Sequence, residues 1–365
     1  MQGHLCQQCR KSYTEESAWL VRGSWYAREV HRYAVDHWLH IRSSLRRTAE
    51  ELRSWLGRQV RWLLWRVGEE RAEGREECYL GASTIQRWLN RAGVKAQQGV
   101  KGQGAGLENS GEFGTDGLWA RLRRGGKRVL LLLVDTVTGV VWTTVASVGE
   151  ESAASWEKLF ERVKEAGLSW KDVNGLVSDA AQGLLSFLRE KLAWVHHQRC
   201  VWHFWRSLAG EMASAVAQVA ESSQEQVREQ LKGLLHAVID AASFAAAEEA
   251  LLRLKAYPCG ARPAQKVNEQ LDRLLYPLLA CHQGLSRIAP EWLWRDFRLR
   301  LSRGRNHGSE ERLERAGLLW MVYHNFTPAQ WRSERKRKYK HPGQSPLQVA
   351  GGSPGRISYL DALEV

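Results

Sequence analysis

A change in hydrophobic periodicity near residue 111 most constrains the fold of this chain. Before it, apolar residues recur at three- and four-residue spacing, as Val30, Ala34 and Trp38 do, which is the pattern of a buried helix face. After it, residues 113–122, 128–141 and 141–148 have the lengths and apolar content of strands. The longest apolar run, 129–134, is strand-sized, well short of the roughly eighteen residues of a membrane helix. We therefore expect no membrane span.

The order of the predicted elements indicates the fold class. We expect a helix at 152–166, a short strand at 173–177, a helix at 181–192 and a short strand at 193–197. Three strands followed by helix, strand, helix, strand is the chain order of an RNase H-like α/β domain. The sequence thus predicts a mixed five-stranded sheet flanked by helices. Helical patterns fill 204–287, and two further helices are expected between 290 and 324, separated at 302–308.

The distribution of charge favours a polyanionic partner. The chain has 53 basic and 40 acidic side chains, a net charge of +13, and residues 1–109 and 291–365 each carry a net charge of +6. Positive charge is therefore concentrated in the two end segments, around a nearly neutral middle. Nucleic acid is the partner that such a distribution predicts.

The segment 81–93 predicts a short helix with Ser83 or Thr84 as its N-cap. As the second helix of a helix-turn-helix, it would direct polar side chains to base edges in the major groove. The residues expected on that outer face are Gln86, Arg87, Asn90 and Arg91. An ordinary amphipathic surface helix explains the same pattern equally well.

Three acidic residues occupy positions from which carboxylates could bind divalent cations. Asp116 lies in the first predicted strand, Asp179 follows the fourth, and Glu291 opens a late helix. Phosphodiester chemistry with two Mg²⁺ ions requires such a carboxylate cage. Each residue also has a structural interpretation, since an aspartate often caps a helix and a glutamate in a first turn complements the dipole. Asp135 competes with Asp116, but 135–139 has a typical turn sequence that explains its presence.

The segment 112–203 resembles the catalytic core of Mutator-like transposases of bacterial insertion sequences, which belong to the DDE superfamily. Four motifs carry the resemblance, and the last is the most specific: Thr-Asp-Gly at 115–117, Val-Asp-Thr-Val-Thr-Gly at 134–139, Val-Ser-Asp-Ala-Ala-Gln-Gly at 177–183 and Gln-Arg-Cys-Val-Trp-His at 198–203. The likeness extends over about 110–330. The helix from Glu291 is similar to the family's third-acid helix, although 287–290 departs from the family's Thr-Asn-Asn. Glu310 and Glu311 are the alternatives for the third acid.

The resemblance implies a DNA transposase that binds the terminal inverted repeats of its element, cleaves DNA with Mg²⁺ and transfers the resulting 3′-hydroxyl. Asp116, Asp179 and Glu291 would hold two Mg²⁺ ions, for which Mn²⁺ can substitute. Cys200 and His203 would lie beside the metals, with His203 contacting DNA or orienting the scissile phosphate. A packed structural pair and a pair of zinc ligands are the alternatives. The family also implies double-stranded DNA as partner, a homodimer or larger synaptic complex, and a place in the bacterial cytoplasm with the nucleoid.

Further basic residues are candidates for contacting DNA phosphates. Arg295 and Arg298 flank the late helix, and Arg335 and Lys336 lie in the basic run 332–340. A solvated helix face is compatible with the same residues.

Two other functions fit these residues. One is an RNase H-like nuclease that cuts without strand transfer, and the other is a catalytically inactive, DNA-binding remnant of a transposase. The second is motivated by Cys6 and Cys9, which resemble one knuckle of a zinc ribbon, whereas the next cysteine is Cys78. A structural Zn²⁺ site requires four ligands.

Composition, periodicity and the resemblance together divide the chain into six segments. They are an N-terminal helical DNA-binding region (1–95), a Gly-rich linker (96–111), the first part of the core (112–203), an all-helical insertion (204–287), the last core helices (288–330) and a basic tail (331–365).

Overall fold

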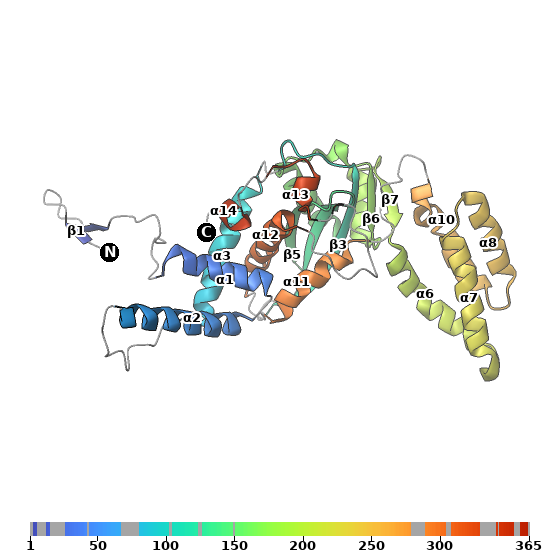
Figure 1. The fold of residues 1–365 in the computed structure, drawn as a ribbon. Helices are drawn as coiled ribbons and strands as arrows, with labels where there is room; N and C mark the ends of the chain where they lie inside the picture. Colours follow the sequence, from blue (N-terminus) through green and yellow to red (C-terminus); the bar gives the residue numbers. More distant parts are fainter. Residues whose placement is uncertain are drawn as a thin grey trace.

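The computed structural model describes residues 3–5, 12–14, 26–41, 44–66, 80–101, 104–122, 126–148, 150–278, 289–303, 308–328, 341, 343–353 and 358–363. Cys6, Cys9, Arg335 and Lys336 lie outside the described residues, so the zinc knuckle and the basic tail stay predictions. Figure 1 shows a central sheet with helices packed around it and a further group of helices to one side.

A mixed five-stranded sheet forms the centre, with the strand order β5-β4-β3-β6-β7. Three long strands pair antiparallel, and two short strands continue the sheet parallel to β3. They are β3 (Glu112–Leu122), β4 (Gly126–Asp135), β5 (Val141–Val148), β6 (Gly175–Ser178) and β7 (His196–Arg199). The predicted five-stranded sheet flanked by helices is confirmed.

The Asp135 carboxylate holds the turn between β4 and β5. Its Oδ1 accepts hydrogen bonds from the backbone N–H groups of Val137 at 2.8 Å and Thr138 at 2.9 Å. Its Oδ2 accepts one from the N–H of Ser110 at 2.7 Å. Asp135 is fully buried, and these bonds fully explain its place as a turn residue.

The side chains of β4 alternate between two hydrophobic cores, because successive residues of a strand point to opposite faces. Val129, Leu131 and Leu133 pack with α4 (Ala153–Glu165) and α5 (Gln182–Lys191). Leu130, Leu132 and Val134 belong to the core on the other face. Burial on both faces explains why the run 129–134 is continuously apolar.

Five helices contribute to this second core: α1 (Arg28–His40), α2 (Leu45–Arg66), α3 (Ala82–Gly99), α11 (Glu291–Arg303) and α12 (Glu310–Phe326). Trp294 of α11 and Trp320 of α12 are fully buried, with ring centroids 6.0 Å apart. The two late helices match the prediction for 290–324. The N-cap of α3 is Gly81, so the prediction of Ser83 or Thr84 as its cap is wrong.

The segment 96–111 differs from the flexible linker that its glycines predicted. Residues 96–99 form the last turn of α3. Beyond it, the N–H of Gly104 donates to the carbonyl of Ala166 at 2.8 Å, and that of Glu108 donates to Ala350 at 2.9 Å. A Cβ at Gly104 would collide with the Trp142 ring, so this glycine permits close packing.

A separate hydrophobic core unites the helices that follow β7. Its fully buried members include Leu208, Leu231, Leu235 and Leu254. The helices are α6 (Val201–Val216), α7 (Gln224–Ile239), α8 (Phe244–Ala256), α9 (Ala261–Asn268) and α10 (Leu271–Leu274). In Figure 1 they lie beyond the β7 edge of the sheet, on the side away from α1–α3. The helical pattern expected from 204 onward is therefore observed.

The remaining elements are short. They are β1 (Gly3–Leu5) and β2 (Ser12–Thr14), which pair antiparallel, three 3₁₀ turns at Trp170–Asp172, Glu221–Ser223 and Tyr276–Leu278, and the helices α13 (Pro346–Val349) and α14 (Tyr359–Ala362). Asp361 of α14 pairs with Arg32 of α1 at 2.8 Å, which joins the last described helix to α1. Among the described helices, none has the length and apolarity needed to cross a membrane.

The contact between α3 and α12 predicts opposite effects of two Gly→Ala substitutions. At Gly93 a Cβ would lie 2.7 Å from the Cβ of Arg315, whereas at Gly57 in α2 it would meet nothing within 4 Å. Gly57→Ala should raise the free energy of unfolding by about 1 kcal/mol, because alanine favours the helix. Gly93→Ala should lower it by roughly 1–3 kcal/mol through overpacking. Urea denaturation of the two variants checks this, and a gain in both would contradict the close contact.

Candidate active site

One predicted acid, Asp116, lies on β3, and a second, Asp179, directly follows the neighbouring parallel strand β6. In the β3–β6 register, Gly114 pairs with Val177, and continuing that register by two residues brings Asp116 level with Asp179. Asp116 is buried, with 5% of its surface exposed. Asp179 opens a tight turn in which its Oδ1 accepts the N–H of Ala181 at 3.1 Å, and Ala180 adopts a positive φ of 66°. An alanine keeps such a φ only where the surrounding structure holds it, so the backbone next to Asp179 is tightly constrained.

The third predicted acid, Glu291, is the first residue of α11 and reaches the same strand from far along the chain. The preceding Pro290 packs on β3 at Gly114, where a Cβ would lie 3.0 Å from the Pro290 Cδ. The side chain of Glu291 is 27% exposed, and its Oε2 lies 3.9 Å from Nε2 of His203. Its Oε1 lies 3.6 Å from Nη1 of Arg298, one of the exposed arginines of α11 together with Arg295.

The electrostatics of Asp116 indicate that the predicted acids share one pocket. Burial raises the pKa of Asp116 to about 8, with further contributions from the charges of Asp179, Glu291 and Glu151. Burial is the largest cause of the shift, and the charges of the other carboxylates add to it because they lie near enough for their fields to reach Asp116. No group of three His, Cys, Asp or Glu side chains among the described residues is close enough together to ligate a metal ion as placed.

Sequence reasoning missed a fourth carboxylate of this pocket, Glu151. It precedes α4, and its side chain lies over Gly117, where an added Cβ would collide with the Glu151 carboxylate. Burial and the charge of Asp179 raise the pKa of Glu151 to about 7, although a hydrogen bond from Trp119 opposes the shift. The only sequence signal was a glycine directly after Asp116, and its meaning depends on tertiary structure.

Cys200 and His203 lie at the start of α6, beside the acids. Cys200 is fully buried, and its Sγ accepts a hydrogen bond from the N–H of Ala289 at 3.2 Å. Burial raises the pKa of the Cys200 thiol. Burial also lowers the pKa of His203, while the charges of Asp179 and Glu291 oppose that change. The ring of His203 therefore faces the carboxylates.

The alternative third acids are engaged elsewhere. Glu310 pairs with Arg128 at 3.3 Å and with Lys158 at 3.7 Å, and Glu311 pairs with Arg315. Arg128 lies opposite Ala120 of β3, four residues along the strand from Asp116, or about 13 Å. The geometry therefore favours Glu291 over Glu310 and Glu311.

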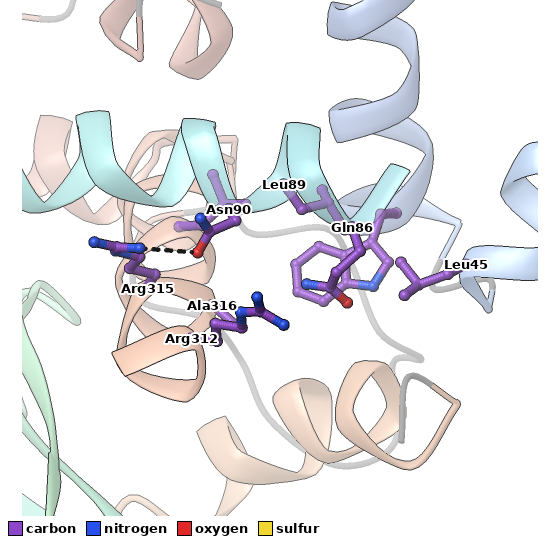
Figure 2. Close-up of a pocket in the computed structure, with 9 residues that line it drawn as sticks. Leu45, Gln86, Leu89, Asn90, Arg312, Arg315 and Ala316 are labelled. Carbon is purple, nitrogen blue, oxygen red and sulfur yellow. Dashed lines mark hydrogen bonds between the residues drawn. The ribbon is translucent and has the colours of Figure 1, made fainter. Parts of the chain in front are cut away.

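The predicted DNA-reading face of α3 is fully exposed at only two of its four residues. Arg87 and Arg91 are exposed, but Gln86 and Asn90 are half-buried and line a small pocket against α12 (Figure 2). The Oδ1 of Asn90 accepts a hydrogen bond from Nη1 of Arg315 at 3.1 Å. The close approach at Gly93 turns this side of α3 toward α12, which the amphipathic pattern alone does not reveal.

Comparisons with known proteins agree with the resemblance seen in the sequence. Residues 122–281 match the family model described as transposase, Mutator family. This segment includes Asp179, Cys200 and His203, whereas Asp116 and Glu291 lie outside it. An 84-residue stretch is 32% identical to the transposase for insertion sequence element IS256 in transposon Tn4001, in the versions from Staphylococcus aureus and from Enterococcus faecalis. The match covers 23% of this chain and 19% of each relative's length.

The buried acids predict that stability falls with rising pH when divalent cations are absent. Asp116 and Glu151 hold their protons in the fold to about pH 8 and 7, whereas in the unfolded chain they lose them near their ordinary pKa of 3.8 and 4.5. Between those values the folded state binds more protons than the unfolded chain, so the free energy of unfolding should fall by several kcal/mol from pH 5 to 8.

Urea denaturation in EDTA across this pH range measures the effect. Asp116→Asn should flatten the slope, while Glu248→Gln, an exposed site in α8, should leave it unchanged. An equally steep slope in Asp116→Asn would show that this carboxyl ionises normally.

Proposed function

We propose that this chain is a DNA transposase that cleaves DNA and transfers the resulting strand. Its residues 122–281 match the Mutator family of transposases. The observation that carries the proposal is the pocket shared by Asp116, Asp179 and Glu291, which come from β3, the end of β6 and the start of α11. These are the acids that the family resemblance assigns to catalysis.

The sheet supports an RNase H-like core for this function. Its three antiparallel strands are followed by two short strands parallel to β3, with helices between them. In this interpretation α6–α10 form an all-helical insertion between β7 and the helix that carries Glu291. Their separate hydrophobic core fits that description.

The donor set of the pocket suits Mg²⁺. Carboxylate oxygens are its preferred protein ligands, and the raised pKa of Asp116 reports a concentration of negative charge that a cation would relieve. We propose that Asp116, Asp179 and Glu291 hold two Mg²⁺ ions. When bound, the pair would activate the attacking oxygen and stabilise the leaving oxygen of the phosphodiester.

The neighbouring residues would hold the DNA strand at these acids. His203 lies next to Glu291, from where its ring can orient the scissile phosphate. Arg295 and Arg298 are exposed on α11 and offer cations to the flanking phosphates. Arg87 and Arg91 offer the same on α3, whereas Gln86 and Asn90 face α12 and are not proposed as DNA ligands.

Substitution of each carboxylate should abolish cleavage while sparing DNA binding. Asp116→Asn, Asp179→Asn and Glu291→Gln should each lower the cleavage rate by at least about 10³-fold, because a bound metal contributes several kcal/mol to the transition state. Glu310→Gln is the matched control, since its side chain is 28% exposed, close to the 27% of Glu291.

A supercoiled plasmid carrying the DNA that naturally flanks this gene serves as substrate, and gel shifts measure binding. Wild-type cleavage in Asp179→Asn would refute the assigned site. A pre-cleaved duplex with a free 3′-hydroxyl then separates the transposase from a nuclease, because only the transposase joins that end to a second DNA.

Metal binding should also be visible without DNA. At pH 8, Mg²⁺ or Mn²⁺ at ten times its Kd should stabilise the protein by about 1.4 kcal/mol. The stabilisation should vanish in Asp116→Asn and persist in Glu310→Gln. Thermal unfolding with and without the metal tests this, and an equal shift in Asp116→Asn would place the bound ion elsewhere.

A further inference from the structure

We infer that Cys200 is a positioning residue, which fixes the start of α11 relative to the end of β6 and thereby sets the placement of Glu291 beside Asp179. The inference deepens the proposed function and rests on it. Cys200 acts through its own N–H and its Sγ, each bonded to the backbone of one segment, and its thiol is assigned no contact with metal or DNA.

One residue contacts both chain segments that deliver these acids. The backbone N–H of Cys200 donates to the carbonyl of Ser178 at 2.7 Å, and Ser178 directly precedes Asp179. The Sγ of Cys200 accepts a hydrogen bond from the N–H of Ala289 at 3.2 Å, and Ala289 lies two residues before Glu291. Cys200 therefore links the two acids through five consecutive covalent or hydrogen-bonded links, which pass by way of Ser178, Cys200, Ala289 and Pro290.

The link is enclosed and has little freedom to shift. Cys200 and Ala289 are both fully buried and pack with Val177 and Tyr276 in one small cluster. Close-packed interiors resist displacement, so the separation that the thiol imposes is transmitted to the helix start. A looser side chain at position 200 would not impose it.

The start of α11 packs on the sheet but is not one of its strands, so a specific hydrogen bond matters for its position. Glu291 belongs to a helix end rather than to a strand, so no hydrogen-bond ladder sets its position, and Pro290 has no N–H to donate. In the described chain before Glu291, the fixed points are the thiol contact at Ala289 and the packing of Pro290 on Gly114. Of these, only the thiol contact also reaches the strand end of Asp179.

The two residues of the Cys-x-x-His element thus have different roles in this chain. Cys200 orders the backbone beneath the acids, while His203, one turn later, faces Glu291 itself. The spacing follows from the helix, which brings residues three apart to the same side of α6.

The test compares three variants of Cys200 with a control cysteine. Cys200→Ala removes the acceptor, Cys200→Val removes it while filling the space, and Cys200→Ser restores an oxygen acceptor. Cys259→Ser, in the turn between α8 and α9, is the control, because Cys259 is also a free cysteine.

Cleavage is measured at saturating plasmid DNA across a Mg²⁺ titration. Residues that orient metal ligands typically contribute 10–100-fold to metal affinity or activity. In Cys200→Ala and Cys200→Val we expect the half-maximal Mg²⁺ concentration to rise about tenfold and the rate to fall about 10–100-fold, with DNA affinity within twofold of wild type. Cys200→Ser should recover to within a few-fold of wild type.

Hydrogen–deuterium exchange supplies a readout that does not need activity. The amide of Ala289 should exchange faster in Cys200→Ala and Cys200→Val and be protected in Cys200→Ser, while peptides from α12 stay unchanged. If Cys200→Ala fails to fold, the exchange rate of the Ala289 amide in Cys200→Val provides the test.

Two results would overturn the inference: an unchanged Mg²⁺ requirement in Cys200→Val, or equal effects of the serine and valine variants, as expected if the thiol only fills space. Failure of the proposed function looks different. Asp116→Asn and Glu291→Gln would then cleave normally, whatever the exchange at Ala289 shows.

Discussion

The parallel pairing of β6 with β3 is the interaction on which the candidate site depends. It brings the carboxylates of Asp116 and Asp179 together at the end of β6. Asp116 is almost completely buried there. Two like charges in such a place repel each other and are poorly hydrated, so the pKa of Asp116 rises. The backbone hydrogen bonds of the sheet hold the acids together against that repulsion. A divalent cation is the natural complement of the arrangement, because it replaces the lost hydration and offsets the charge at once.

The sequence predicted those parts of the structure that follow from local patterns. The apolar run at 129–134 correctly predicted a strand, and the turn sequence at 135–139 correctly predicted the turn role of Asp135. Asp116, Asp179 and Glu291 were identified from motif order, and their catalytic role stays a prediction. Parts that depend on contacts between distant segments could not be predicted. Whether Asn90 faces solvent or Arg315 is decided by how closely α3 approaches α12, and Glu151 is recognised only when the fold lays it over Gly117. Likewise, the glycines of 96–111 predicted a linker, and the close packing of Gly104 against Trp142 depends on a contact between distant segments.

The N-terminal helices and the helix that carries Glu291 are built on one hydrophobic core. Side chains from α1, α2 and α3 belong to the same buried cluster as Trp294 and Phe297 of α11 and one face of the sheet. The division into an N-terminal region and a core therefore describes the order of the chain better than its packing. A substitution that loosens α3 against α12 is expected to reach α11 through the stacked Trp320 and Trp294.

The hydrogen bond between Cys200 and Ala289 joins residues 89 positions apart, and all of the helices α6–α10 lie between its two partners. The segment that carries these helices thus begins and ends at the contact between Cys200 and Ala289. Because the closing entropy of such a long loop changes only slowly with its length, helices could be gained or lost within it at small thermodynamic cost. The geometry of the acids would stay as it is. The helices α6–α10, and the surface that they present, could therefore change during evolution without altering how the acids are placed.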